Sequence, residues 1–169
     1  EVESQVGKGT RFDVYLPVHL VDAEGAESVD GEEEAVPGGG ETILVAEDEV
    51  DVREFAQKAL ERLGYRVLVA EDGEDAVSVF EAHRHEVDLV VLDVVMPKLG
   101  GRRAYAAIST LRAGVPVVYI TGYSSEMIGF SSDAKAGMVL LQKPFTLAEL
   151  ARTVRESLDA RGKGGNVKR

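Results

Sequence analysis

The sequence predicts an α/β protein in which a parallel sheet carries helices on both faces. Three observations favour this fold. After residue 41, short apolar runs alternate five times with segments whose apolar residues recur at helical spacing. The apolar runs contain few polar residues, which is typical of parallel strands that are buried on both faces. Polar residues follow directly after several runs, and ligands of such sheets bind beyond the carboxyl ends of the strands.

Five strands are expected from the apolar runs. The first run, Ile43-Leu44-Val45-Ala46, has no polar side chain, and the third run, which ends at Leu92, is the most apolar. Because strand and helix segments alternate, the strands are expected to lie parallel in one sheet. The expected strands cover residues 43–46, 66–70, 88–92, 116–120 and 138–142.

Five helices are expected, one after each strand. In the first helix the apolar residues recur every three or four positions, and Gly64 then ends it. In the last helix an apolar stripe runs from Leu147 to Leu158. The fourth segment has the weakest helical pattern. The expected helices cover residues 51–63, 73–83, 101–111, 125–131 and 147–160.

The region before the sheet has a different composition. Residues 1–20 contain one expected strand, over 11–16, which is too little for a domain and is predicted to be a remnant of a larger one. Residues 21–41 contain eight acidic residues, no basic residue, and Pro37 followed by three glycines. Such a segment buries too little apolar surface to fold, so a flexible linker is expected. Residues 161–169 are expected to form a flexible tail.

Composition and charge exclude several classes of function. The 169-residue chain has a net charge of −11, but outside residues 21–41 its 22 acidic residues are nearly balanced by 19 basic ones. No nucleic-acid surface is therefore expected. No apolar run is long enough to span a bilayer, so no membrane contact is expected either. Cysteine is absent, which excludes disulfides and thiolate metal sites and favours a cytoplasmic location.

Acidic residues at the strand ends predict a cation site. Glu47 and Asp48 follow the first expected strand, and Asp93 follows the third. Three carboxylates at one sheet edge repel one another by about 3 kcal/mol per pair, at about 5 Å and an effective dielectric constant of about 20. A cation is needed to hold them together. Magnesium suits carboxylate and carbonyl oxygens and requires only one or two carboxylates when a phosphate oxygen completes its shell.

The same residues suggest a phosphoryl acceptor. Asp93 ends the most apolar strand and is the expected nucleophile, because a carboxylate can attack phosphorus to form an acyl phosphate. Asp48 is expected to bind the metal directly and Glu47 through water. Lys143, after the fifth strand, would neutralise phosphoryl oxygens. The hydroxyl of Thr121, after the fourth strand, would form a hydrogen bond with the phosphoryl group.

This arrangement resembles the receiver domain of response regulators. The resemblance covers about residues 42–160. It implies a doubly wound, flavodoxin-like sheet of order 2-1-3-4-5, a Mg²⁺ cofactor, phosphotransfer from a histidine, and slow self-catalysed hydrolysis. The motifs that carry it are Glu47-Asp48, Asp93-Val94-Val95-Met96-Pro97, Gly100-Gly101, Ile120-Thr121-Gly122 and Lys143-Pro144-Phe145.

Further details follow from the resemblance alone. It implies that the main-chain carbonyl of Val95 is a magnesium ligand and that the Lys143–Pro144 peptide is cis, which X–Pro bonds permit at modest cost. Leu140 lies three residues before the lysine, where the family usually has an aromatic side chain that turns inward on phosphorylation. Switching is therefore expected to depend on Thr121 and on the loop and helix after the fourth strand.

Residues 3–17 resemble a second family, the histidine-kinase ATPase domain. Their pattern is similar to the glycine-rich lid and last strand of that domain, in which Gly7 and Gly9 would let backbone amides approach nucleotide phosphates. The resemblance implies that the parent is a hybrid histidine kinase with a C-terminal receiver. The remnant alone is not expected to bind ATP. The implied phosphodonor is a histidine kinase or a histidine phosphotransfer domain, and homodimerisation is left open.

Two other functions are compatible with parts of the pattern. A magnesium phosphatase of the haloacid-dehalogenase type also forms an aspartyl phosphate, but its nucleophile follows the first strand in an Asp-x-Asp motif, where this chain has Glu47-Asp48-Glu49. A degenerate receiver would act only as an interaction surface. The complete set of acids, threonine and lysine argues against that function, and Leu140 argues for it.

Overall fold

The computed structural model describes residues 1–15, 38–122 and 138–164. The chain divides into two units, Glu1–Glu34 and Ala35–Arg169, which are treated separately below. Most of the predicted linker, the predicted helix at 125–131 and the end of the predicted tail lie outside the described residues.

The described part of the first unit is a β-hairpin. Strands β1 (Val2–Gln5) and β2 (Gly9–Phe12) pair antiparallel. The prediction of a single strand over 11–16 is wrong: β2 begins and ends earlier and has a partner. Gly7 and Gly9 reverse the chain with φ angles of 78° and 100°, which favour glycine. Both strands are exposed, so no buried face imposed the apolar alternation on which the prediction depended.

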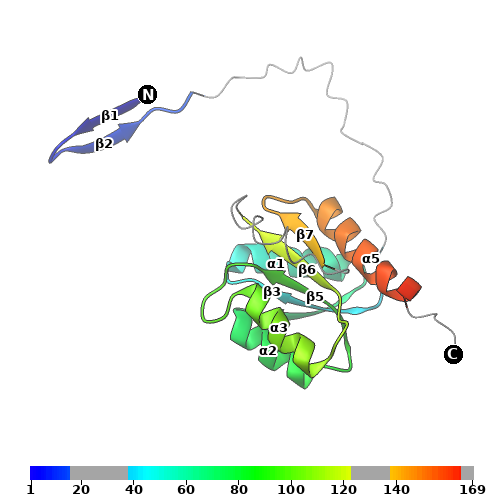
Figure 1. Cartoon of the computed structure of the whole chain (residues 1–169). Coiled ribbons are helices and arrows are strands. Elements are labelled where there is room, and N and C mark those ends of the chain that lie inside the picture. The colour runs from blue at the N-terminus through cyan, green and yellow to red at the C-terminus, as the bar shows by residue number, and fades with distance from the viewer. Residues whose placement is uncertain (16–37, 123–137, 165–169) are drawn as a thin grey trace, which may run out of the picture. The chain divides into compact units, whose positions relative to one another are not determined.

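The second unit contains the predicted five-stranded parallel sheet. Its spatial order is β4-β3-β5-β6-β7, which confirms the expected order 2-1-3-4-5 (Figure 1). The strand boundaries agree with the prediction to within one residue. The strands are β3 (Thr42–Ala46), β4 (Arg66–Ala70), β5 (Val87–Asp93), β6 (Val117–Thr121) and β7 (Met138–Gln142).

Helices cover both faces of this sheet, as predicted. Helices α1 and α5 pack on one face, and α2 and α3 lie side by side on the other (Figure 1). Alternate residues of each strand serve the two faces: Ile43 and Val45 belong to one core cluster, and Leu44 and Ala46 to the other. The helices are α1 (Val50–Arg62), α2 (Gly73–Ala82), α3 (Gly101–Leu111) and α5 (Leu147–Gly164).

Helix α5 is longer than predicted. It continues to Gly164, past the expected end at residue 160. At the amino end of the sheet, the main-chain NH of Gly39 donates to the carbonyl of Leu63 at 3.1 Å. A Cβ added to Gly38 would lie 2.0 Å from that same carbonyl oxygen. The chain is therefore already packed on the unit at Gly38.

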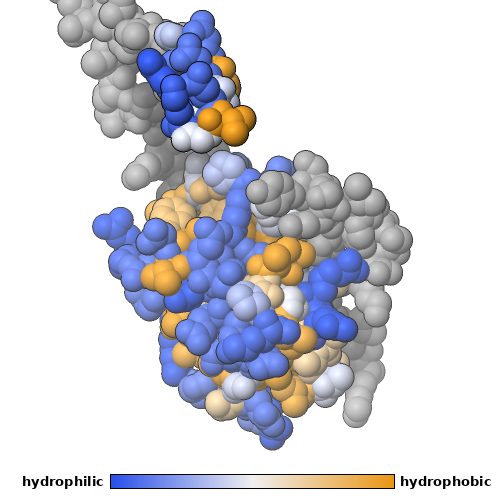
Figure 2. Space-filling model, turned by 90° about the vertical axis from the view of Figure 1, so that its left-hand side faces the viewer, coloured by the Kyte–Doolittle hydropathy of each residue, from blue (hydrophilic) through white to orange (hydrophobic). Residues whose placement is uncertain are grey.

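The surface is mainly hydrophilic in the view of Figure 2, where hydrophobic side chains form small separate patches among polar ones. The large apolar side chains that stay exposed in the second unit include Val50, Phe55 and Val95. Among the described residues, none of the helices combines the length and apolar character needed to cross a bilayer.

Candidate functional site

Two acidic residues follow β3 at the carboxyl edge of the sheet. The main-chain NH of Glu47 donates to the carbonyl of Ala70 at 3.2 Å, so pairing with β4 continues to this residue. Its side chain is fully buried, whereas Asp48 is exposed. Arg53 of α1 donates to the main-chain carbonyls of Glu47, at 2.5 Å, and Asp48, at 3.3 Å. Helix α1 thus holds the turn that carries both carboxylates.

Asp93 is the last residue of β5, between β3 and β6 in the sheet. It pairs with Ile120 and is 5% exposed. Its Oδ1 accepts a hydrogen bond from the main-chain NH of Val95 at 2.8 Å. Helix α3 begins directly behind it, since a Cβ on Gly101 would lie 2.1 Å from the Asp93 carbonyl oxygen. Glycine at this position lets the helix pack against the strand end.

The structure brings the three predicted carboxylates together. One ligand oxygen from each of Glu47, Asp48 and Asp93 lies within 4.8 Å of the other two. Two of these side chains are buried, where like charges repel more strongly than in water. Such a cluster is stable only beside positive charge.

Lys143 supplies part of that positive charge. It follows β7, and its Nζ lies 2.6 Å from Asp93 Oδ2, 2.8 Å from Glu47 Oε2 and 3.2 Å from Glu49 Oε1. Burial lowers the pKa of Lys143, but its hydrogen bonds to Asp93 and Glu47 outweigh burial, so the pKa lies above its ordinary value. The side chain is a permanent cation at neutral pH.

Glu47 is the most perturbed of the acids. Burial raises its pKa, the hydrogen bond from Lys143 opposes this rise, and the nearby charge of Asp93 adds to it, giving a pKa of about 7. Glu47 Oε2 is buried and forms no hydrogen bond of good geometry, although Lys143 Nζ lies 2.8 Å away. Both oxygens of Glu47 thus face the Lys143 ammonium group, Oε1 at 3.0 Å and Oε2 at 2.8 Å.

The two remaining predicted residues adjoin this cluster. Thr121 is the fully buried last residue of β6, and its carbonyl accepts a hydrogen bond from the main-chain NH of Lys143 at 2.8 Å. Val95 contacts Asp93 through its main-chain NH, and its own side chain is 60% exposed. The Lys143–Pro144 peptide is cis, as the family resemblance implied.

The donor set fits Mg²⁺. The clustered ligand atoms are carboxylate oxygens, which hard divalent cations prefer, and one of them is buried without a good hydrogen bond. Lys143 pairs with Glu47, Glu49 and Asp93, and Asp48 lies beside Glu47 and Asp93, so negative charge remains in excess. A divalent cation would offset most of it.

Sequence reasoning missed two residues of this region. Glu49 contacts the Lys143 amine, and Arg53 holds the turn after β3. Arg53 lies four residues after Glu49, one helical turn into α1, but the main-chain carbonyls that it contacts leave no signal in the sequence.

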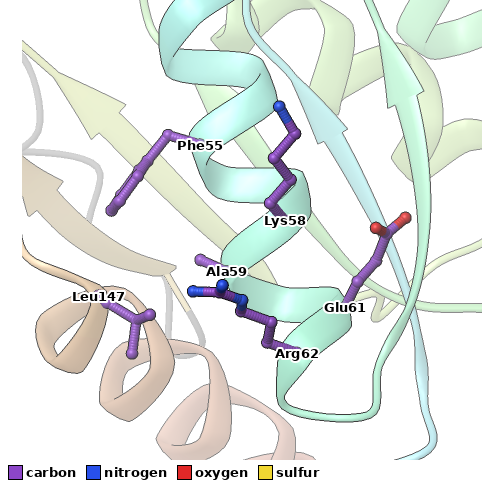
Figure 3. A pocket seen from close by; sticks show the side chains of 6 residues that line it. All are labelled: Phe55, Lys58, Ala59, Glu61, Arg62 and Leu147. Carbon is purple, nitrogen blue, oxygen red and sulfur yellow. The ribbon is translucent and has the colours of Figure 1, made fainter.

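A hollow on another part of the unit lies between α1 and α5 (Figure 3). Phe55 and Leu147 give it an apolar wall, and charged side chains of α1 border it. None of the predicted site residues lines it. Its lining residues are Phe55, Lys58, Ala59, Glu61, Arg62 and Leu147.

Fold and site together define a doubly wound α/β module with an acidic, lysine-bridged pocket at the carboxyl edge of its sheet. The family model "Response regulator receiver domain" matches residues 43–155. This chain belongs to the response regulator receiver family. It therefore contains a receiver domain of the kind used in two-component signalling.

Several curated relatives are similar to it. The sensor kinase CckA of Brucella abortus (strain 2308) is 35% identical over 164 residues, which cover 93% of this chain and 17% of CckA. The receiver protein CpdR of the same organism is 33% identical, over 70% of this chain and 97% of CpdR. The sensor kinase/phosphatase LuxN of Vibrio campbellii (strain ATCC BAA-1116) is 31% identical, over 89% of this chain and 19% of LuxN. The chain thus spans less than a fifth of the two sensor kinases.

Solved structures of receiver domains are also similar to this chain. The receiver domain of the hybrid histidine kinase CckA is 33% identical, with a TM-score of 0.60, and the match covers 69% of this chain and 98% of that one. A receiver domain protein from Clostridium thermocellum is 25% identical, with a TM-score of 0.67, over 73% of this chain and 98% of that one.

Proposed function

We propose that this chain accepts a phosphoryl group on Asp93 from a phosphohistidine, with Mg²⁺ as cofactor. One observation carries the proposal: Lys143 Nζ lies 2.6 Å from Asp93 Oδ2, inside a cluster whose carboxylate oxygens lie within 4.8 Å of one another. A structural ion pair would require only one acid. The excess of acids around the lysine supports a site that awaits a cation and a phosphoryl group.

The proposed reaction is a direct transfer. A carboxylate oxygen of Asp93 attacks phosphorus, and the new O–P bond forms as the P–N bond to the donor histidine breaks. The electron pair of that bond returns to the nitrogen, and the histidine, which carries a proton on its other ring nitrogen, leaves as the neutral imidazole. The Lys143 amine shifts its contact from Asp93 to the incoming phosphoryl oxygens. The Thr121 hydroxyl forms a hydrogen bond with the phosphoryl group. Slow hydrolysis by water returns the free carboxylate.

Glu47, Asp48, Asp93 and the Val95 carbonyl are the residues that would hold Mg²⁺. When bound, the ion neutralises charge on the phosphoryl oxygens in the transition state. The protein's own part is to keep the carboxylates fixed: α1 holds the turn after β3, and the Val95 NH orients Asp93.

The proposed partner is a histidine kinase or a histidine phosphotransfer domain. Exposed apolar side chains support a protein donor, since Val50, 55% exposed, and Val95, 60% exposed, each lie two residues from a site acid, Asp48 or Asp93. Such side chains suit contact with another protein more than with water. Contact with nucleic acid or membrane is not part of the proposal, and homodimerisation is left open.

We also propose that the chain is part of a hybrid histidine kinase and acts in the cytoplasm as a relay or feedback module. The kinase-like pattern at residues 3–17 supports this, as does the similarity to CckA. The family match begins at residue 43, and residues 43–169 make up about three quarters of the chain. The similarity to CckA covers 93% of the chain, so it must include residues before the receiver domain. Output is proposed to depend on Thr121, because Leu140 stands at the usual aromatic position. The family match favours this function over a phosphatase.

The test is direct phosphorylation. The chain is incubated with Mg²⁺ and a small phosphodonor such as acetyl phosphate, and intact mass is followed over time. Wild type should gain the mass of one phosphoryl group, and beryllofluoride should perturb the Asp93 environment. Asp93→Asn should gain nothing.

The matched control is Asp159→Asn, an identical change on α5 that removes only an exposed partner of Arg155. This control should be modified like wild type. Absence of modification in wild type, or modification that survives Asp93→Asn, would overturn the assignment and favour a degenerate receiver.

A further inference from the structure

The loop between β5 and α3 is tied to a helix that contributes nothing to the acidic cluster. Lys98, in this loop, places its Nζ 2.5 Å from Asp72 Oδ2. Asp72 is the N-cap of α2, where its Oδ1 accepts hydrogen bonds from the main-chain NH groups of Glu74 and Asp75, both at 2.9 Å. The Asp72 carboxylate therefore caps the helix with Oδ1 and binds the lysine of the loop with Oδ2.

The loop also touches α2 through its backbone. Gly73, the first residue of α2, is buried, and a Cβ added to it would lie 1.7 Å from the carbonyl oxygen of Leu99. Only glycine allows the helix start and the loop to approach this closely. The contact lies immediately beside the Asp72–Lys98 pair, so α2 fixes the loop at two adjacent points.

Lys98 has a backbone conformation that requires such support. Its φ of 59° lies in the left-handed region, which residues other than glycine rarely adopt. The ion pair is strong enough to perturb both partners: the hydrogen bond from Lys98 lowers the pKa of Asp72, and the hydrogen bond to Asp72 raises the pKa of Lys98. Asp72 is 4% exposed, whereas the Lys98 side chain is 55% exposed, so water is kept from the carboxylate but not from the ammonium group.

The other end of the loop forms part of the phosphoacceptor site. The Val94 carbonyl accepts a hydrogen bond from the NH of Gly101 at 3.1 Å, and the Val95 NH donates to Asp93 Oδ1 at 2.8 Å. Between these contacts and Lys98 lie only Met96 and Pro97, and the ring of Pro97 restricts its own backbone. A displacement at Lys98 is therefore passed to Val95 through a short, stiff segment.

We propose that Asp72 and Lys98 are positioning residues for the phosphoacceptor site, which hold the main chain of Val95 against Asp93 by fixing the far end of the loop on α2. This inference rests on the proposed function, in which the Val95 carbonyl is a metal ligand. A ligand carbonyl on a loop depends on what holds that loop, because partners outside the ligand set orient the ligands.

The first variants are Asp72→Asn and Lys98→Met. Asparagine caps helices as well as aspartate, so Asp72→Asn keeps the helix start while removing the charge that holds Lys98. Phosphorylation by acetyl phosphate is measured as a function of Mg²⁺ concentration. The apparent Mg²⁺ affinity should fall about threefold to tenfold in each variant, less than for direct partners of ligands. The rate at saturating Mg²⁺ should change little.

Three comparisons separate positioning from general stability. The double variant should be no weaker than either single one, because both remove the same interaction. Lys98→Arg, which keeps the charge, should restore most of the Mg²⁺ affinity. Lys58→Met removes a lysine from a similar pair, 2.6 Å from Glu54 on the exposed face of α1, and should leave the Mg²⁺ dependence unchanged. The midpoint of thermal unfolding without Mg²⁺ should be similar in wild type and in all five variants.

Each outcome has a defined meaning. If wild type is phosphorylated and both single variants show wild-type Mg²⁺ dependence, the positioning role is wrong while the proposed function stands. If the variants lose rate at saturating Mg²⁺ without losing affinity, the positioning role is also wrong. If wild type is not phosphorylated, the proposed function fails and the positioning role fails with it.

Discussion

Two ion-pair networks lie at opposite ends of the sheet and differ in how deeply their acidic side chains are buried. At the amino end, Arg155 of α5 binds Glu41 at 2.9 Å and Asp159 at 2.8 Å and reaches the Tyr65 hydroxyl at 3.5 Å. The planar guanidinium serves these partners at once and is fixed by them. At the carboxyl end, Lys143 is a point charge among more acids than it can neutralise.

The difference separates a structural network from a functional one. The two arginine partners leave one negative charge in excess, but the side chain of one of them, Asp159, is 58% exposed, so this charge is partly solvated. The lysine faces Asp93 and Glu47, whose side chains are 8% and 0% exposed, so the excess charge there is buried. Charge excess in a buried site is costly without a ligand, and it supports the proposal that a cation and a phosphoryl group act at the carboxyl end.

The largest effect is expected from removal of the lysine. Lys143→Ala should keep the fold but slow phosphorylation by about tenfold or more, because no side chain then neutralises the phosphoryl oxygens. The change should also uncouple phosphorylation from its conformational consequence, as followed by NMR shifts after beryllofluoride addition. The matched variant Lys58→Ala should behave like wild type. An unfolded Lys143→Ala protein would contradict this expectation.

The next effect is pH dependence at the carboxyl end. The folded pKa of Glu47, about 7, lies above its ordinary value of 4.5, so the folded state binds the proton more tightly than the unfolded state. Without Mg²⁺, the contribution of Glu47 to stability should therefore be complete below about pH 4.5 and be lost as pH rises through about 7, an effect of about 1 to 3 kcal/mol. Glu47→Gln should flatten this profile in denaturant titrations. An unchanged slope in that variant would assign the effect to another group.

At the amino end the expected effect concerns stability alone. Arg155→Met leaves the half-buried Glu41 carboxylate without its cation and should lower the free energy of unfolding by about 1 kcal/mol. The Mg²⁺ dependence of phosphorylation should stay at the wild-type value. If this variant loses Mg²⁺ affinity, the two ends of the sheet are coupled, and the amino-end network is not purely structural.

The smallest effect is expected from Mg²⁺ itself. At ten times its dissociation constant, a ligand that binds only the folded state stabilises it by about 1.4 kcal/mol. Added Mg²⁺ should thus raise the thermal midpoint of wild type by a few degrees. Asp48→Asn should reduce that rise, whereas Asp159→Asn should keep it. Chelation should reverse it in every protein that responds.

The sheet and the acidic cluster could be predicted because burial leaves a pattern. Parallel strands between two helix layers must be apolar, and their ends must carry the polar residues of the site. The hairpin of the first unit could not be predicted in this way, because its strands are exposed and Val2 and Phe12 pair without a core. Its strand boundaries depend on the turn glycines, not on apolar alternation.

The contacts that hold the site in place also could not be predicted from the sequence. Arg53 acts through main-chain carbonyls, which have no sequence signature, and Lys98 meets Asp72 across 26 positions of the chain. Single charged residues of this kind usually lie in solvent, so only the folded geometry identifies them. The site residues were predictable because they occur as a set at strand ends. Residues that orient the set are scattered.

The packing at Gly38 has a consequence for modularity. Because Gly38 and Gly39 already rest on the Leu63 carbonyl, the boundary at which this receiver could be exchanged between proteins lies upstream of Gly38, in the acidic segment. A graft made there preserves the hydrogen bond of Gly39 and the Glu41–Arg155 pair. The upstream sequence can then vary in length and composition during evolution without disturbing the start of the sheet.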